Sequence, residues 1–244
     1  MALSGSYDFT VDRDTIITQA LLKCGAVSSG QTPTAAEITD GSTMLNLMLK
    51  SWMADGLQLF TQTHISATPV ESQYKYTFGT GGDIDTTNHR PEEIFSVRRR
   101  LTSDTTDIEM QRLSRDDYFR LAARTAEGVP TQWYLEPAIA TTGQNLYIWP
   151  APDATFAAGS TLEIIYQKPF DDMDAATNNL AFPQSWELAV MINLAAWLAV
   201  DNGLSVSDRR ELRELADIEK ARVMEWDNEK TSLFIVPRME ESFN

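Results

Sequence analysis

The chain of 244 residues is 43% hydrophobic and 23% charged, which is the balance of a globular protein and excludes a mainly disordered one. Its formal net charge is -15, and an acidic surface repels a phosphate backbone, so we expect no high-affinity nucleic-acid binding. One cysteine cannot form an internal disulfide, and two histidines argue against a histidine-rich metal site. The first ten residues lack an apolar signal core, so we expect a soluble chain that is intracellular when made.

Two helices are predicted near the start of the chain. Apolar residues recur with helical spacing over residues 13–27, and Gly25 lies near the end of that pattern. Thr34 precedes Glu37 by three residues, a capping-box pattern at the start of a second helix that runs to about Asp55. We expect these helices to form an antiparallel hairpin.

The middle of the chain has sequence patterns that are typical of β-strands. Tyr76 and Phe78 alternate with polar residues, and we expect Phe95 and Val97 on one side of the next strand. Ser114 is the expected N-cap of a short helix. Strands are predicted over residues 59–70, 74–78, 94–101, 108–113, 132–135, 145–149 and 161–167, with the short helix over 114–123 and turns over 150–159.

A helical pattern begins again at Pro183 and continues to about residue 230. The most apolar run, residues 188–200, has 13 residues, fewer than the roughly 20 that a membrane-spanning helix needs, and predicts a buried core helix. We expect Asp208 to cap a last helix over residues 209–230. Its inward-facing side chains are expected to be Leu212, Leu215, Ala216, Val223 and Trp226.

Helix pairs at both ends of the chain enclose roughly a hundred residues of strands. An amphipathic pair is most readily buried against another pair, so the sequence predicts an α+β fold. In this fold, the N- and C-terminal helix pairs form a four-helix bundle with a β-rich insertion and an extended C-terminal tail. The predicted boundaries are 1–57 and 183–231 for the two halves of the bundle, 58–182 for the insertion and 232–244 for the tail.

The sequence offers no clear reaction chemistry. Residues 79–82 are rich in glycine and follow a strand, but neither a helix start nor a P-loop lysine comes after them, which favours a flexible hairpin tip. Cys24 lies on the apolar stripe of the first helix, which favours core packing. His64 and His89 lack partners at metal-ligand spacings. We therefore expect no catalytic residue, no cofactor and no metal.

One basic cluster and one apolar tail suggest contacts with other chains. Consecutive residues of a strand point to opposite faces, so Arg98, Arg99 and Arg100 cannot form one flat patch, and a salt bridge across a subunit interface is as plausible as a nucleic-acid contact. Residues 233–236 are four consecutive apolar residues beyond the last helix, and such a segment is usually covered by a partner.

An ordered series of short segments runs through the second half of the chain. It comprises Gly128-Val129-Pro130-Thr131-Gln132-Trp133-Tyr134, Leu146-Tyr147-Ile148-Trp149-Pro150-Ala151-Pro152-Asp153, Leu162-Glu163-Ile164-Ile165-Tyr166 and Leu180-Ala181-Phe182-Pro183. The first helix pair, with its end Trp52-Met53-Ala54-Asp55-Gly56, fits the same series. Over about residues 12–230 the chain resembles the tail accessory factors, or head-to-tail adaptors, of tailed bacteriophages, and most of all those of short-tailed (podovirus-type) phages.

The resemblance implies a virion structural protein and no enzyme. Such adaptors form a homo-oligomeric ring, usually a dodecamer, below the portal protein at the head–tail junction, after assembly in the host cytoplasm. The ring seals the DNA-filled head, extends the channel used in packaging and ejection, and offers a platform for a downstream tail or nozzle protein. It implies transient contact with phage DNA in the channel, no membrane, and no catalytic residues.

Three sets of residues are candidate contacts in such a ring. The tail is expected to grip the portal or a neighbouring subunit, basic and acidic residues are expected between ring neighbours, and the glycine-rich loop is expected to face the next tail component or a neighbour. The first set is Leu233, Phe234, Ile235, Val236, Pro237, Met239 and Phe243; the second is Arg98, Arg99, Arg100, Arg209, Arg210, Arg213 and Glu214; the third is Gly79, Gly81, Gly82 and His89.

Two alternatives stay open at this point. One is a tail-associated peptidoglycan hydrolase that uses paired carboxylates such as Glu71 and Asp85, although nothing in the spacing singles out these two residues. The other is a head-completion adaptor of a long-tailed phage.

Overall fold

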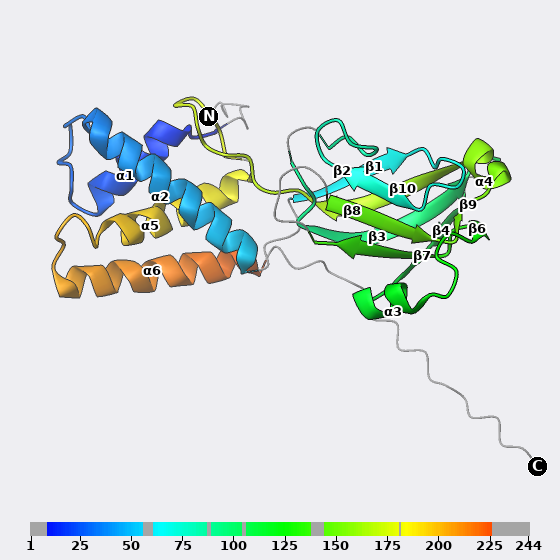
Figure 1. Ribbon diagram of the computed structural model, residues 1–244. Coiled ribbons are helices and arrows are strands. Elements are labelled where there is room, and N and C mark those ends of the chain that lie inside the picture. The colour runs from blue at the N-terminus through cyan, green and yellow to red at the C-terminus, as the bar shows by residue number, and fades with distance from the viewer. Residues whose placement is uncertain are drawn as a thin grey trace, which may run out of the picture.

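The computed structural model describes residues 9–55, 61–86, 89–103, 106–137, 144–180 and 182–225. Within these ranges the chain forms six helices and ten strands, so the predicted mixed α+β class is confirmed. Figure 1 shows α1, α2, α5 and α6 gathered at one end of the molecule and the strands, with α3 and α4, at the other.

The first two helices each begin after a residue whose side chain caps the helix. The Asp12 side chain accepts a hydrogen bond from the Thr15 N–H at the start of α1 (Arg13–Lys23). This helix ends four residues before the predicted end, because Gly25 takes a left-handed conformation with φ 71°. The capping box between Thr34 and Glu37 is confirmed at the start of α2 (Ala35–Ala54).

Of the last two helices, the first begins where it is predicted and the second begins earlier. Helix α5 (Gln184–Leu198) follows Pro183 as expected and buries eight of its side chains, although Leu188 and Trp197 are partly exposed. Helix α6 (Val206–Met224) begins three residues before the predicted range, because the Ser205 hydroxyl accepts a hydrogen bond from the Asp208 N–H. Ser205 is therefore the N-cap, and the prediction that Asp208 caps this helix is wrong.

Side chains of all four of these helices share one hydrophobic cluster. Helix α5 contacts α1, α2 and α6, and α1 contacts α2. The approach of α1 to α2 is close at Gly41, where an added Cβ would lie 2.4 Å from Ile17 Cγ2. The cluster includes Ile16, Ile17, Leu21, Leu45, Met48, Trp52, Trp186, Val190, Leu194 and Val223.

The strands form two four-stranded sheets and one short two-stranded sheet. The orders are β1-β10-β3-β4, β2-β8-β7-β5 and β6-β9, and all neighbours are antiparallel except β5 with β7 and β6 with β9. The strands are β1 (Gln62–Ala67), β2 (Lys75–Phe78), β3 (Glu93–Leu101), β4 (Asp107–Glu109), β5 (Gln111–Arg112), β6 (Glu127–Gly128), β7 (Gln132–Glu136), β8 (Gln144–Trp149), β9 (Ala151–Pro152) and β10 (Ser160–Gln167).

The second hydrophobic cluster draws on both four-stranded sheets. Tyr76 and Phe78 of β2 and Trp133 of β7 belong to the same cluster as Leu162 and Ile164 of β10. The β3–β10 register shifts between Ile165 and Tyr166. This irregularity places Ile94 and Val97 in the core and leaves Phe95 half-buried, so the predicted pairing of Phe95 with Val97 on one side is wrong.

Two short helices accompany the sheets. Helix α3 (Arg115–Arg120) begins at the predicted cap Ser114 but is shorter than expected. Helix α4 (Ala154–Gly159) lies where turns were predicted, because the Asp153 side chain accepts a hydrogen bond from the Phe156 N–H and Phe156 reaches the core.

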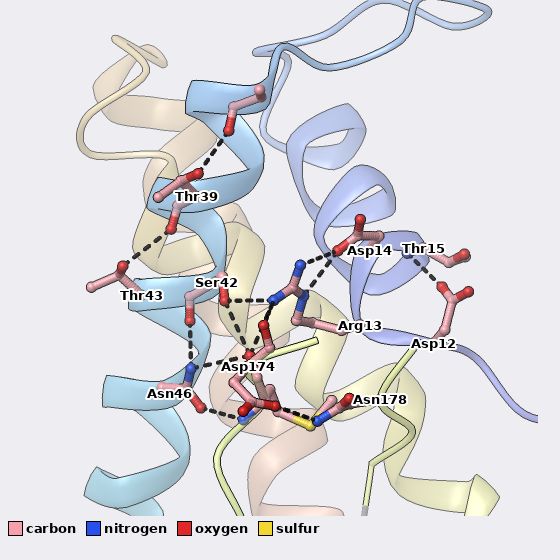
Figure 2. A network of polar contacts seen from close by, with 12 residues as sticks. Asp12, Arg13, Asp14, Thr15, Thr39, Ser42, Thr43, Asn46, Asp174 and Asn178 are labelled. Carbon is pink, nitrogen blue, oxygen red and sulfur yellow. Dashed lines mark hydrogen bonds and ion pairs between the residues drawn. The ribbon is translucent and has the colours of Figure 1, made fainter. Parts of the chain in front are cut away.

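The segment from β10 to α5 is fastened to the first two helices. Lys50 Nζ donates to the Phe170 carbonyl at 2.6 Å. Figure 2 shows Arg13 and Asn46 reaching the same segment: Arg13 donates to the carbonyl oxygens of Met173 and Asp174, and Asn46 Oδ1 accepts from the Met173 N–H at 2.9 Å. These contacts connect the strand region to the helices.

Candidate interaction surfaces

A groove lies between α2, α5 and α6. Its cavity volume is about 440 Å³, which is within the range of sites that hold a ligand or a short peptide segment. Trp197 and Val200 on its wall are partly exposed, so the groove offers apolar surface to an incoming group. The other lining residues are Met44, Ser51, Trp52, Asn193, Ala196, Asp201, Arg213, Ala216, Asp217 and Lys220.

One end of this groove is closed by Lys220. Its ammonium group lies 2.6 Å from Asp55 Oδ2 and 5.5 Å from the centre of the Trp52 ring, which joins α6 to the C-terminal end of α2. Deeper in the groove, Asn193 donates from Nδ2 to the carbonyl oxygens of Ala189 and Ala216, both at 2.9 Å. The polar side chain that interrupts the apolar run of α5 therefore ties α5 to α6.

A second cavity of about 450 Å³ shares Met44 and Asp201 with the groove. Its charged lining residues are Glu37, Asp40 and Asp201, so all its formal charges are negative. Within the part of the chain that the structure describes, Asp40 and Asp201 make no ion pair. The groove thus leads from a lysine-closed end toward an acidic end.

Helix α6 carries four of the residues expected between ring neighbours. Arg210 and Glu214 are exposed, Arg213 lines the groove, and Arg209 is half-buried. Leu215 is 47% exposed, so its predicted inward orientation is wrong. The same prediction is confirmed for Ala216 and Val223, which form the buried face of the helix, and Leu212 is half-buried against the helical cluster. Trp226 lies outside the described residues.

The arginines of β3 lie on both faces of their sheet, as expected from the strand period. Arg99 donates to the Pro130 carbonyl at 2.9 Å. Arg100 forms a bidentate pair with Asp107 at 2.6 and 2.8 Å, and Arg98 lies opposite Glu109 in the β3–β4 register. The guanidinium of Arg100 is therefore already engaged within the chain, and a contact between ring neighbours there stays a prediction.

Arg100 belongs to a polar cluster around the buried carboxylate of Glu163 on β10, which is 4% exposed. The Glu163 oxygens accept from Ser66 at 2.5 Å and from Thr161 at 2.9 Å, and His64 Nε2 lies 2.7 Å away. Burial acts to raise the pKa of Glu163, but the two hydroxyl donors and the nearby positive charges outweigh it, so the pKa lies below its ordinary value.

An aromatic and basic patch surrounds α3. The buried Tyr118 ring packs on Tyr134 and Tyr147 with centroid distances of 5.6 and 5.1 Å, and burial raises the pKa of Tyr118 to about 12. Arg115 and Arg124 lie 5.9 and 5.2 Å from the centre of the exposed Phe119 ring.

Sequence reasoning missed the patch around α3. Of the aromatic residues on β7 and β8, Trp133 lies in the sheet core, whereas Tyr134 and Tyr147 pack on Tyr118 of α3. The available signal was the placement of four arginines, Arg112, Arg115, Arg120 and Arg124, around the Tyr118-Phe119 pair in an acidic chain.

The glycine-rich loop is not the tip of a hairpin, because β2 and β3 lie in different sheets. Asp83 Oδ2 accepts from both the N–H and the hydroxyl of Thr77 at 2.8 Å, and Ile84 folds back into the core. Gly81 is exposed with φ 72°, which suits only glycine well.

The other candidate residues of this loop are less exposed than Gly81. Gly79 is buried, and Gly82 is half-buried with its Cα so close to the chain that a Cβ would meet the Thr77 carbonyl oxygen at 2.5 Å. The ring of His89 stacks on Tyr166, with Nε2 3.1 Å from the phenol oxygen. A contact of this loop with another protein stays a prediction.

The residues considered for reaction chemistry include Cys24, Glu71 and Asp85. The Cys24 side chain is fully buried, as the apolar stripe predicted, and burial raises the pKa of its thiol. Glu71 and Asp85 are both exposed, and neither lines any of the cavities described above or the one of about 580 Å³ beside α3.

The described ranges lack two kinds of feature. They contain no group of three or more metal-ligating side chains that could hold an ion. They also contain no helix of the length and apolar character needed to cross a membrane.

The predicted tail contacts lie outside the described residues. This applies to Leu233, Phe234, Ile235, Val236, Pro237, Met239 and Phe243. Their role therefore stays a prediction.

The chain was also compared with known proteins. A search of curated proteins found no match. The SU10 adaptor protein family matches residues 14–231, which includes both the helical cluster and the sheets. This is a family of phage adaptors, and membership implies a structural role in the virion, with portal and tail proteins as partners, and argues against an enzyme. Because the match spans most of the chain, the protein belongs to the SU10 adaptor protein family.

Proposed function

We propose that this protein forms the head-to-tail adaptor ring below the portal of a tailed phage, most like those of short-tailed phages. In this role it seals the DNA-filled head, extends the DNA channel used in packaging and ejection, and presents a platform for the next tail or nozzle protein. The observation that carries the proposal is the family match over residues 14–231, which includes both structural regions of the chain.

The division of the chain into a helical part and a β-rich part supports this proposal. We propose that residues 1–57 and 183–231 form a four-helix bundle, that 58–182 form a β-rich insertion, and that 232–244 form an extended tail. The support is that α1, α2, α5 and α6 share one hydrophobic cluster, whereas a second cluster draws on the two sheets.

Ring assembly needs two different complementary surfaces on each subunit, because contacts in a ring are heterologous. On the helical side, Arg210 and Glu214 are exposed candidates for one of them. On the sheet side, the exposed Phe119 and the arginines beside it are a second candidate. A ring of twelve copies would place each such pair of surfaces in contact at every subunit boundary.

The charge of the chain fits a conduit for DNA. Twelve copies at -15 each would carry a formal charge of about -180, by multiplication of the single-chain value. If part of this charge faces the channel, the wall repels the phosphates and holds no strand tightly. Contact with the DNA would then be transient.

The proposal also assigns contacts to the tail and to the glycine-rich loop. The tail, with Phe234 at the centre of its apolar segment, is proposed to grip the portal or a neighbouring subunit. The glycine-rich loop, with Gly81 exposed at its turn, is proposed to meet the downstream protein or a neighbour. Both assignments place exposed or apolar groups where a second protein would cover them.

The test is to mix the purified chain with purified portal rings and to weigh the product by native mass spectrometry. The expected product is one portal ring carrying twelve copies of the chain. A control mixture with an unrelated acidic protein of similar size must leave the portal unchanged. Failure to bind portal rings, together with clearing of peptidoglycan in a zymogram by the pure chain, would point instead to a hydrolase.

A further inference from the structure

We propose that, in the free chain, the groove between α2, α5 and α6 binds the chain's own apolar segment, residues 233–236. The segment belongs to the part of the chain beyond Glu225, where the described residues end. This inference concerns the protein before assembly and does not rest on the proposed ring.

The groove has the chemistry that an apolar segment needs. Val200 is 59% exposed and Trp197 is 38% exposed on its wall, while the half-buried Met44 supplies further apolar surface. A volume of about 440 Å³ suits a few side chains and is far smaller than a folded domain would require. Leu, Phe, Ile and Val side chains lose contact with water when they occupy such a groove, which favours binding.

The chain is long enough to reach the groove. Lys220 at the closed end of the groove lies five residues before Glu225, a helical distance of about 8 Å. Arg213, further along the groove, lies about 18 Å from Glu225 by the same rise. The eight residues from Glu225 to Leu233 span up to about 26 Å when extended, so the segment can return alongside α6.

The charges give the segment a direction. Figure 1 shows that α2 and α6 approach each other at their C-terminal ends, where Lys220 pairs with Asp55. A segment that enters there and runs along α6 continues toward the acidic cavity that contains Asp40 and Asp201. Arg238 follows the apolar segment by two residues and would meet these carboxylates, which lack an ion pair in the described structure.

The same chain is favoured over a second copy as the donor of the segment. A segment joined to the groove by a short stretch of its own chain has an effective concentration in about the millimolar range, whereas purified protein is usually studied at about micromolar concentration. The segment therefore fills the groove of its own chain in the free protein. If it also grips the portal or a neighbour after assembly, it must first leave this groove.

The test places a photo-crosslinking residue, p-benzoylphenylalanine, at position 234 of the full-length chain. Irradiation of a one-to-one mixture of ¹⁴N- and ¹⁵N-labelled chains is followed by mass spectrometry of the crosslinked peptides. We expect crosslinks to peptides of α2, α5 or α6 that line the groove, within chains of a single isotope. Crosslinks between isotopes, crosslinks to other surfaces, or none at all would each overturn the proposal.

Two exposed valines provide a matched pair of variants. Val200→Glu puts a carboxylate on the groove wall and should lower the crosslink yield at least about tenfold, since an apolar segment cannot pair with that charge. Val206→Glu, at a position 67% exposed and outside the groove, should leave the yield unchanged. Equal yields in the two variants would overturn the proposal.

A charge exchange tests the direction of the segment without relying on the apolar wall. Asp201→Arg places a positive charge at the acidic end of the groove and should lower the yield severalfold through repulsion of Arg238. Combining it with Arg238→Glu should restore the yield. If the single change has no effect, or if the double change does not recover, the proposed path of the segment is wrong. Circular dichroism of each variant checks that the helices are intact.

Discussion

Replacement of Gly41 by alanine sets two known effects against each other in the contact between α1 and α2. Alanine is favoured over glycine inside a helix by about 1 kcal/mol. The new Cβ, however, would lie 2.4 Å from Ile17 Cγ2, and Ile17 is fully buried. Overpacking of a dense core costs about 1–3 kcal/mol, and so close an approach to a fully buried side chain belongs at about 2–3 kcal/mol, the upper part of that range. After the gain of about 1 kcal/mol from helix propensity is subtracted, we expect a net loss of about 1–2 kcal/mol.

Urea denaturation of the full-length chain, followed by far-ultraviolet circular dichroism, measures this loss. In a thermal scan the loss corresponds to a fall in Tm of roughly 2–8 °C. The matched control is Gly159→Ala, because a Cβ at Gly159 meets nothing within 4 Å and its φ is not left-handed. This control should be neutral or slightly stabilising.

A double-mutant cycle isolates the steric cause. Ile17→Leu removes the branched methyl that the new Cβ would meet, so the loss caused by Gly41→Ala should be smaller in that background. The reasoning is refuted if Gly41→Ala is as stable as the parent chain. It is also refuted if the loss is unchanged when Ile17 is already leucine.

Three further outcomes are expected. Glu163→Gln should lower the free energy of unfolding at pH 7 by about 1–3 kcal/mol. Because the pKa of Glu163 in the folded chain lies below its usual 4.5, its stabilisation is complete above that pH and is lost as the pH falls through the folded value. The difference in urea midpoint between the parent and Glu163→Gln should therefore shrink between pH 6 and pH 3.5, and a constant difference would contradict this. Ser205→Ala should cost about 1 kcal/mol in the same unfolding assay, and Asp208→Ala should cost less because Asp208 supplies only its backbone N–H to the cap; the reverse order would restore Asp208 as the cap. Deletion of residues 232–244 should leave a folded chain by circular dichroism that no longer joins portal rings in native mass spectrometry, whereas normal incorporation would refute the role of the tail.

Local signals in the sequence predicted the helix starts that depend on neighbouring residues. The capping box of Thr34 and Glu37 and the N-cap at Ser114 are confirmed, because each needs only a side chain three residues from its partner. The start of α6 was placed wrongly, since both Ser205 and Asp208 are capping residues and only the backbone path decides between them.

Features that depend on contacts across the chain were not predictable in the same way. The irregular register between β3 and β10 moves Phe95 out of the core, and no periodicity within β3 reveals the strand that pairs with it. The loop after Phe78 was interpreted as a hairpin tip, because the separation of β2 and β3 into different sheets is a property of the whole fold.

The interaction surfaces show the same limit. The groove between α2, α5 and α6 is formed by residues more than 140 positions apart, such as Met44 and Trp197, so it became visible only in the folded chain. Leu215, Ala216 and Val223 all fit the apolar period of α6, but only Ala216 and Val223 are buried in the folded chain. The arginines beside Phe119 were readable in the sequence, but their placement over the aromatic ring was not.

The helical cluster is divided between the two ends of the chain. Ile17 and Trp52 precede the strands, whereas Trp186 and Leu194 follow them. A ribosome that has just completed β10 has made only half of that cluster, although it has made every described strand. We therefore expect the nascent chain to form its sheets while α1 and α2 still expose their apolar sides, and to cover those sides only when α5 leaves the exit tunnel.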